Sequence, residues 1–233
     1  MRSATAPDAV PDTAPAAIFF DLDGTLADTA PDLTGVLNTL RQQQNLTALP
    51  LAELRPHIST GVRGLLQKGL AIDPADPSYA DLQQRFLDLY EQTMHRGETQ
   101  LFDGITACLD ALDAQRMPWG IVTNKHLRFA TPLVENLGLR QRAVCLVCGD
   151  SAPRAKPHPD PLLLAAQIAG VQPRDCIYVG DDERDIIAAH AAGMQAIAAA
   201  WGYLGSDKPV ADWGADIIIA SPKDILRIAA PSR

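Results

Sequence analysis

The sequence predicts an α/β fold in which a parallel sheet is covered by helices and a second, all-helical segment is inserted into the chain. Two observations predict the sheet: short, nearly continuous apolar runs recur along the chain, and helix-like stretches separate them. A third observation predicts the insertion, because residues 32–99 break this alternation and contain helix-like stretches but no good strand. The length of 233 residues accommodates both parts.

The candidate strands are apolar runs that end in polar or small residues. They cover 17–20, 119–122, 144–147, 176–179, 195–200 and 217–219. The helix-like stretches between them are rich in Ala, Leu and charged residues, and cover 105–116, 126–137, 159–170 and 183–192. Gly138, Gly170 and Gly193 follow three of these stretches as expected helix C-caps. This pattern predicts a Rossmann-like core, which binds ligands at the carboxyl ends of its strands.

We expect three parts in the chain. Residues 1–15, dominated by Ala, Pro, Asp and Thr, are expected to form a mobile tail. Residues 16–31 and 100–233 form the α/β core, and residues 32–99 form a small helical domain. The N-terminal stretch lacks the apolar segment of a signal peptide, and no run approaches the roughly 18 apolar residues of a membrane span. We therefore expect a cytoplasmic protein with no membrane partner.

The formal net charge of −8 argues against nucleic acid as a partner. It is compatible with a small anionic substrate, because a metal ion and a few local cations reverse the field at one site. The four cysteines are expected to be reduced. Cys145 and Cys148 form a CxxC pair, but they lie in an apolar run without a second Cys or His pair, so we interpret them as core residues.

Polar residues follow several of the candidate strands. Asp21-Leu-Asp-Gly-Thr-Leu follows the first run, Thr123-Asn-Lys follows the second, and Gly180-Asp-Asp-x-x-Asp follows the run at 176–179. Each has a purely structural explanation when taken alone: an Asp-Gly turn, a helix N-cap, or acidic residues in a first helical turn. Carboxylates, a hydroxyl and a loop lysine, Lys156, near successive strand ends instead favour one shared site.

These groups have the chemistry that cleavage of a phosphate ester requires. A phosphate monoester repels an anionic nucleophile, so a carboxylate attacks it only where the negative charge is compensated. Asp21 fits the nucleophile, and Asp23 fits the general acid that later acts as base. Thr123 offers a hydroxyl to a phosphate oxygen, and Lys156 offers a positive charge. Asp181 is a candidate ligand for a hard divalent cation.

In this order and spacing the elements resemble the haloacid dehalogenase (HAD) superfamily of phosphohydrolases. The resemblance covers residues 16–229 and implies a HAD-like core with the inserted helices as a cap over the site. It also implies Mg²⁺, held by the side chains of Asp21 and Asp181 and by the backbone carbonyl of Asp23. Asp185 is expected to hold a metal-bound water or Lys156. Asp182 is likewise expected outside the direct metal ligands, with direct coordination of the metal as the alternative.

The expected partner is a small phosphorylated metabolite, and the oligomeric state stays open. Thr123, Asn124 and Lys125 are expected to contact this substrate from the core. The cap residues expected to contact it lie in His57-Ile-Ser-Thr-Gly-Val-Arg63, where Gly61 permits a tight loop and Arg63 pairs with an anion. A solvated lysine and an ordinary surface arginine are the alternatives for Lys125 and Arg63.

Within the superfamily the sequence resembles phosphoglycolate phosphatases most. Three segments carry this resemblance: Thr29-Ala-Pro-Asp-Leu33, Val122-Thr-Asn-Lys125 and Tyr178-Val-Gly-Asp-Asp182. It implies hydrolysis of 2-phosphoglycolate to glycolate and phosphate. Three other segments are similar to the N-acetylmuramic acid 6-phosphate phosphatase branch: Pro118–Lys125, Trp201-Gly-Tyr-Leu204 and Trp213-Gly-Ala-Asp216. The alternative function is therefore that of this branch or of another sugar-phosphate phosphatase.

Other function classes fit the sequence less well. A dehalogenase attacks carbon and needs neither Asp23 nor a metal-binding Asp181. A phosphomutase shares the core and differs in a cap that excludes water, so it is only weakly disfavoured. A non-catalytic receiver domain carries its acidic pair before its phospho-acceptor and has no helical insertion. A binding protein derived from the enzyme is expected to have lost a catalytic residue, and the sequence retains them all.

Overall fold

The computed structural model describes residues 14–94, 97–205 and 208–230. The predicted mobile tail, residues 1–15, lies outside the described residues except at its last two positions. The described strands are β1 Ala17–Phe20, β2 Ala27–Asp28, β3 Gln100–Leu101, β4 Trp119–Val122, β5 Leu146–Val147, β6 Cys176–Gly180, β7 Gln195–Ala199 and β8 Ile217–Ile219. Every described helix is too short or too polar to cross a lipid bilayer.

The described helices alternate with the strands in the second half of the chain. They are α1 Ala30–Gln43, α2 Leu51–Leu54, α3 Gly61–Leu70, α4 Tyr79–Thr93, α5 Ile105–Ala114, α6 Leu127–Asn136, α7 Asp160–Ala169, α8 Glu183–Ala192 and α9 Lys223–Ala229. Short 3₁₀ turns cover Arg55–His57, Pro173–Asp175 and Val210–Asp212. Gly138, Gly170 and Gly193 have the positive φ of 71–75° that ends a helix in the left-handed region.

Six strands form one parallel sheet in the order β5-β4-β1-β6-β7-β8. The predicted α/β fold is therefore confirmed, and β1 lies at its centre between β4 and β6. The run at 144–147 forms a shorter strand than predicted. Val144 is exposed and precedes β5 at the edge of the sheet, although its amide still donates to the Trp119 carbonyl of β4 at 2.9 Å.

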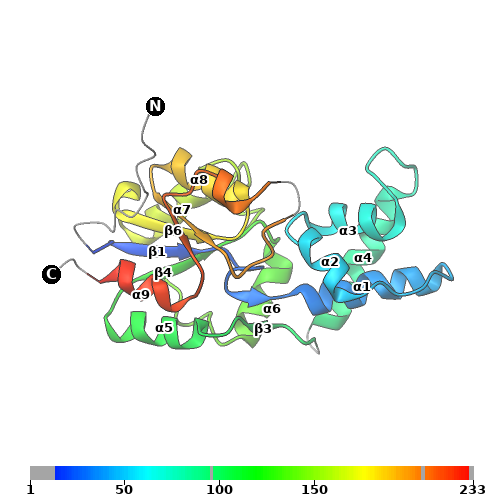
Figure 1. The fold of residues 1–233 in the computed structure, drawn as a ribbon, viewed down its shortest axis with the longest axis horizontal. Coiled ribbons are helices and arrows are strands. Elements are labelled where there is room, and N and C mark those ends of the chain that lie inside the picture. The colour runs from blue at the N-terminus through cyan, green and yellow to red at the C-terminus, as the bar shows by residue number, and fades with distance from the viewer. Residues whose placement is uncertain (1–13, 95–96, 206–207, 231–233) are drawn as a thin grey trace.

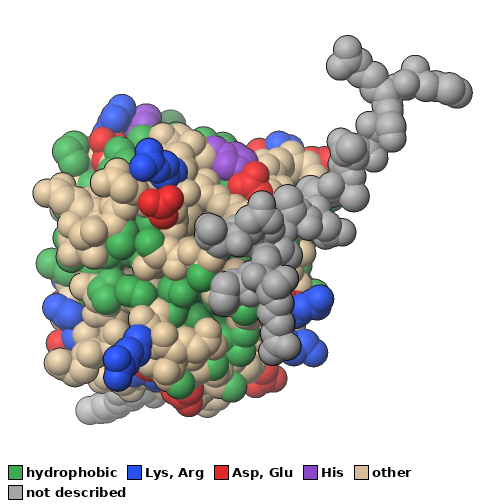
Figure 2. All heavy atoms as spheres, turned by 90° about the vertical axis from the view of Figure 1, so that its left-hand side faces the viewer, with side chains coloured by type: hydrophobic (Ala, Val, Ile, Leu, Met, Phe, Trp, Pro, Cys, Tyr) green, Lys and Arg blue, Asp and Glu red, His purple; other side chains and the backbone are tan. Residues whose placement is uncertain are grey.

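Helices cover both faces of the sheet (Figure 1). Side chains of α5, α6 and α9 pack with Ile18 and Phe20 of β1, whereas side chains of α7 and α8 pack with Ala17 and Phe19. Successive β1 residues therefore enter opposite layers, as the pleat of a strand requires. On the end of the core away from the insertion, acidic and basic side chains lie interspersed among apolar ones (Figure 2).

Helices α1 to α4 lie together at one side of the sheet (Figure 1). We call residues 32–99 the insertion, although α1 begins two residues earlier, at Ala30. The helix α4 buries Leu82, Phe86 and Tyr90 at intervals of four residues, which places them on one helix face. This apolar face belongs to the same cluster as the α5–α6–α9 layer, so the two parts share one continuous core.

A small two-stranded sheet joins the insertion to the core. Strands β2 and β3 pair in antiparallel fashion, with Ala27 opposite Leu101 and Asp28 opposite Gln100. They bring together the two points where the chain enters and leaves the insertion. The sequence analysis missed these strands, since two residues are too few for a periodic signal.

Candidate active site

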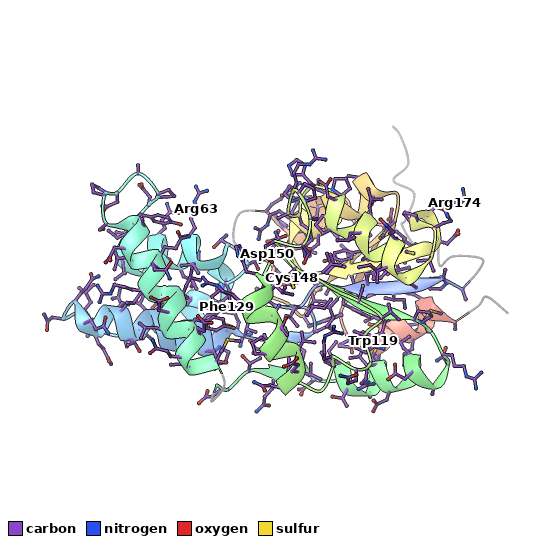
Figure 3. All side chains as sticks on the ribbon, turned by 180° about the vertical axis from the view of Figure 1, so that it is seen from behind. Arg63, Trp119, Phe129, Cys148, Asp150 and Arg174 are labelled. Carbon is purple, nitrogen blue, oxygen red and sulfur yellow. The ribbon has the colours of Figure 1, made fainter. Side chains whose placement is uncertain are left out.

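The carboxyl ends of three adjacent strands bring the predicted core residues together. Asp21 follows β1, Thr123 follows β4, and Asp181 follows β6. All three line a cavity of about 510 Å³ between the sheet and the insertion, and so do Lys156 and Asp185. The insertion forms the opposite wall, and Figure 3 shows Arg63 on its side of the molecule and Phe129 of α6 at the junction.

Three carboxylates form a group that is suited to a cation. Oxygen atoms of Asp21, Asp181 and Asp185 lie within 4.8 Å of one another. Asp181 is buried and accepts hydrogen bonds from Thr25 Oγ1 at 2.8 Å and from the Tyr203 amide at 2.9 Å. Burial, followed by the charges of Asp21 and Asp185, raises the pKa of Asp181 well above its usual range.

This donor set fits a hard divalent cation, which takes carboxylate oxygens and would relieve the mutual repulsion of the three charges. The group contains both side chains that were expected to bind the metal, Asp21 and Asp181, and it adds Asp185, which was expected to hold a metal-bound water or Lys156. The expected contribution of Asp23 to the metal is through its backbone carbonyl.

Lys156 is the cation at the base of the site. Its Nζ lies 3.0 Å from Asp21 Oδ1 and 2.7 Å from Asp185 Oδ1, and it donates to Tyr178 Oη at 2.7 Å. Tyr178 in turn donates to the Val122 carbonyl at 2.7 Å. Burial lowers the pKa of Lys156, but the charges of Asp185 and Asp21 outweigh burial and raise it, so the ammonium group stays charged.

Asp23 is held by two donors on its Oδ1 atom. Lys125 Nζ lies 2.9 Å away, and Thr29 Oγ1 donates at 2.6 Å. The Lys125 side chain is only 9% exposed, and its ammonium group lies 4.9 Å from the centre of the Tyr90 ring. Lys125 is therefore enclosed between the core and α4, which is not the environment of a solvated lysine.

The remaining predicted residues of the β4 end serve different purposes. Thr123 is 2% exposed, and its hydroxyl accepts a hydrogen bond from the Lys125 amide at 3.2 Å. The Asn124 side chain donates to the Lys156 carbonyl at 2.9 Å and accepts a hydrogen bond from the Lys156 amide at 3.0 Å. Its amide group thus ties the lysine loop to the end of β4, while the residue also lines the cavity.

Asp182 caps helix α8. It accepts from the Arg184 amide at 2.9 Å, and its own amide donates to Asp185, which completes a capping box. The Arg184 guanidinium also pairs with Asp182, at 2.7 Å, and donates to the backbone carbonyl of Ser59 in the insertion. Asp182 is therefore engaged by α8 and Arg184 and stays outside the three-carboxylate group.

The insertion contributes both predicted residues and others that the sequence analysis missed. Gly61 begins α3 with φ of 67°, and Arg63 lies on that helix; both line the cavity. Four more residues of the predicted segment line it too: Ile58, Ser59, Thr60 and Val62. The lining residues that the sequence analysis missed are Leu33 of α1 and Gln83, Phe86, Leu87 and Tyr90 of α4. Their helical spacing predicts a buried face, and nothing in the sequence separates a face that lines a cavity from one inside a core.

Comparison with known proteins places the chain in a family. The family model described as "Haloacid dehalogenase-like hydrolase" matches residues 18–199, which is most of the chain. A phosphoglycolate phosphatase of Xanthomonas campestris pv. campestris is 44% identical over 93% of this chain and 97% of its own. An N-acetylmuramic acid 6-phosphate phosphatase of Pseudomonas aeruginosa is 36% identical over 91% of this chain and 93% of its own.

The fold comparison agrees with the sequence comparison. A crystal structure described as a predicted phosphoglycolate phosphatase from Haemophilus somnus has a TM-score of 0.80 and 28% identity. It covers 92% of this chain, and 98% of that protein is matched. The resemblance that the strand-end motifs indicated is confirmed, and the chain belongs to the haloacid dehalogenase-like hydrolase family.

Proposed function

We propose that this protein is a Mg²⁺-dependent phosphomonoesterase that works through a phospho-aspartate intermediate on Asp21. The observation that carries the proposal is the position of the Asp21 carboxylate. It lines the cavity at the end of the central strand, 3.0 Å from the Lys156 ammonium group and within 4.8 Å of two further carboxylates. A carboxylate nucleophile for a dianionic ester needs both neighbours, a fixed cation and a place for a divalent metal.

The proposed reaction has two steps. An Asp21 oxygen attacks phosphorus and forms an acyl phosphate, while Asp23 gives its proton to the departing alkoxide. Asp23 then takes a proton from a water molecule, whose oxygen attacks the same phosphorus and releases phosphate from Asp21. Thr123 and Lys156 hold phosphate oxygens during both steps. Lys125, 2.9 Å from Asp23, orients that carboxyl group toward the leaving group.

The carboxylates of Asp21, Asp181 and Asp185 and the carbonyl of Asp23 would hold the metal ion. Mg²⁺ bound there supplies compensation for the negative charge of the phosphate group and of Asp21. We further propose that the insertion acts as a cap over the cavity, because it forms the wall opposite the strand ends. Its closure would exclude bulk water from the acyl phosphate.

The relatives suggest two substrates to compare. The 44% identical relative is named a phosphoglycolate phosphatase, which supports 2-phosphoglycolate as the first substrate to test. The 36% identical relative is named an N-acetylmuramic acid 6-phosphate phosphatase, and a cavity of about 510 Å³ specifically favours an ester of that larger kind. Both are phosphoric monoesters, so the proposed chemistry is the same for each.

Phosphate release from p-nitrophenyl phosphate tests the proposed chemistry. We expect release that requires Mg²⁺, stops with a chelator and falls by about 10⁴-fold or more in Asp21→Asn, which keeps the size of the side chain but removes the nucleophile. Circular dichroism checks that the variant is folded. Activity that survives Asp21→Asn in the folded variant would refute the intermediate, and activity that survives the chelator would refute the metal.

A further inference from the structure

The segment that follows β7 is bound closely to the strand-end site. The Tyr203 amide donates to Asp181 Oδ2 at 2.9 Å, and the Trp201 indole donates to the Thr25 carbonyl at 3.0 Å. A Cβ atom on Gly202 would overlap Asp181, so the chain passes this close to the carboxylate only because the residue is glycine. The backbone of Tyr203 is therefore fixed relative to the cation site, and the residue is 4% exposed.

The Tyr203 hydroxyl group reaches the point where the chain enters the insertion. We call residues 28–30 the entry linker. The hydroxyl group accepts hydrogen bonds from the Thr29 amide at 2.8 Å and the Ala30 amide at 3.0 Å, and it donates to Asp28 Oδ1 at 3.0 Å. Burial raises the pKa of Tyr203, so the phenol stays protonated and remains a donor. One hydroxyl group thus holds the backbone of the entry linker against the core.

This hydroxyl group replaces a helix cap that Thr29 does not make. Thr29 occupies the N-cap position of α1, where a threonine hydroxyl commonly accepts a hydrogen bond from the first helical turn. Its side chain makes no such bond and instead donates to Asp23 Oδ1 at 2.6 Å. The amide groups at the start of α1 still need acceptors, and Tyr203 supplies one to Thr29 and Ala30. The Thr29 hydroxyl is therefore available to hold Asp23.

The contacts of Asp23 determine which of its oxygens carries a proton. Thr29 Oγ1 and Lys125 Nζ both donate to Oδ1, at 2.6 and 2.9 Å. An oxygen that accepts two hydrogen bonds is a poor site for a proton, so the proton for the leaving group resides on Oδ2. A shift of Thr29 would remove one of the two contacts that fix this orientation.

We infer that Tyr203 is a positioning residue for the general acid: its hydroxyl group holds the entry linker in the place from which Thr29 orients Asp23. The inference rests on the proposed phosphatase function and adds to it a residue that does not line the cavity and acts through Thr29. Loss of the hydroxyl group should impair delivery of the proton to the leaving group more than transfer of the phosphoryl group itself.

The dependence of the rate on the leaving group tests this role. The p-nitrophenolate ion departs without a proton, whereas phenolate is a stronger base and benefits from one. In Tyr203→Phe we expect kcat/KM with Mg²⁺ to fall roughly tenfold for phenyl phosphate and less than about twofold for p-nitrophenyl phosphate. The ratio of the two values does not depend on the fraction of folded enzyme. Any loss of kcat with p-nitrophenyl phosphate should be matched by a fall in KM, because only the later water step uses Asp23 on that substrate.

A double-mutant cycle tests whether Tyr203 acts through Thr29. Thr29→Val removes the hydroxyl group that bonds to Asp23 and should give the same dependence on the leaving group. Tyr203→Phe with Thr29→Val should lose little more kcat/KM for phenyl phosphate than the larger single loss, since residues of one network are not additive. Tyr79→Phe is the matched control and should leave every value unchanged, because Tyr79 begins α4 and its hydroxyl bonds to Gln83 at 3.3 Å.

The possible failures of the inference and of the proposed function are distinguishable. Equal losses of kcat/KM for the two esters, additive losses in the cycle, or a Tyr203→Phe protein that does not fold by circular dichroism would assign the hydroxyl group a structural role alone. Each of these results overturns the inference and leaves the proposed function intact, because the wild type still hydrolyses both esters. Hydrolysis of neither ester by the folded wild-type enzyme refutes the proposed function, and the inference with it.

Discussion

The ammonium group of Lys156 lies 2.7 Å from the carboxylate of Asp185, and the side chains of both residues are 2% exposed. A buried ion pair of this kind adds little net stability, but removal of one partner leaves the other charge without compensation in a medium of low dielectric constant. Lys156 also lies 3.0 Å from Asp21. One ammonium group therefore compensates the charge of two of the three clustered carboxylates. The loss of Lys156 should affect both the stability of the protein and its activity.

We predict that Lys156→Met lowers the free energy of unfolding by about 3–5 kcal/mol, because the methionine has a similar length and no charge. Phosphatase activity should be lost at the same time. In the double variant Lys156→Met with Asp185→Asn, a large part of the lost stability should return while activity stays absent. Urea denaturation of the metal-free proteins measures the stability of the single and the double variant, and p-nitrophenyl phosphate hydrolysis with Mg²⁺ measures their activity. If Lys156→Met alone is as stable as the wild type, the charge of Lys156 does not stabilise the buried carboxylates.

We predict that the metal-free protein loses stability as the pH rises. Well below the ordinary aspartate pKa of about 3.9, Asp181 is protonated in the folded and in the unfolded chain alike. Because the folded pKa is raised, the folded protein keeps this proton at higher pH than the unfolded chain does, and its stabilising effect disappears as pH rises through the folded pKa. The melting temperature without metal should fall between pH 5 and pH 8.

The same linkage predicts how Mg²⁺ acts. A cation binds the deprotonated carboxylates, so the Mg²⁺-induced rise in melting temperature should be larger at pH 8 than at pH 5. At a concentration about 100-fold above Kd the stabilisation is about 2.7 kcal/mol. Asp181→Asn, which removes both the charge and the titration, serves as control and should abolish most of the rise. Equal rises at the two pH values in the wild type would contradict the prediction.

Much of the fold and of the core site follows from the sequence, for a local reason. The run Cys176–Gly180 is apolar and ends in acidic residues, so both the strand and the position of Asp181 at its end are readable along the chain. The same logic brings Asp21 and Thr123 to one edge, because parallel strands end on the same side. No knowledge of helix docking is needed for these residues.

The residues that the sequence analysis missed depend on docking between distant segments. Tyr178 reads as a core residue of a strand, and only the approach of the Lys156 loop turns its hydroxyl into a hydrogen-bond acceptor. Tyr90 reads as part of the apolar face of α4, and only the packing of that helix over α6 makes it a cavity wall. Arg184 reads as a helix surface charge until the Ser59 carbonyl is placed beside it.

We predict that Gly24→Ala inactivates and destabilises the protein. Gly24 has φ of 90°, and a Cβ atom there would overlap the Asp181 carboxylate. The backbone conformation alone costs about 1–2 kcal/mol for a residue with a Cβ atom, and the displaced carboxylate belongs to the cation site. Gly35→Ala is the control, since Gly35 lies within α1 with open space around it. That change should stabilise the protein by about 0.5–1 kcal/mol. Thermal unfolding and p-nitrophenyl phosphate hydrolysis distinguish the two variants.

The final prediction concerns the link between the core and the insertion. Arg184, in the first turn of α8, pairs with Asp182 and donates to the Ser59 carbonyl, so it joins the strand-end site to the loop before α3. If the insertion closes over the cavity, Arg184→Ala removes a contact that holds this loop in place. We expect a severalfold lower kcat/KM for the preferred substrate. The loss of stability should stay below about 1 kcal/mol, because the ion pair is partly exposed.

Arg174→Ala is the matched control for this prediction. Arg174 lies at the opposite end of the core (Figure 3), its side chain is 81% exposed, and it also neighbours an aspartate, Asp175, at 3.9 Å. Its removal should leave both kcat/KM and stability unchanged, since a contact of this length at the surface contributes little. If Arg184→Ala behaves in the same way as Arg174→Ala, the contact with Ser59 does not position the insertion, and the apolar packing between α4 and α6 must hold the cavity wall by itself.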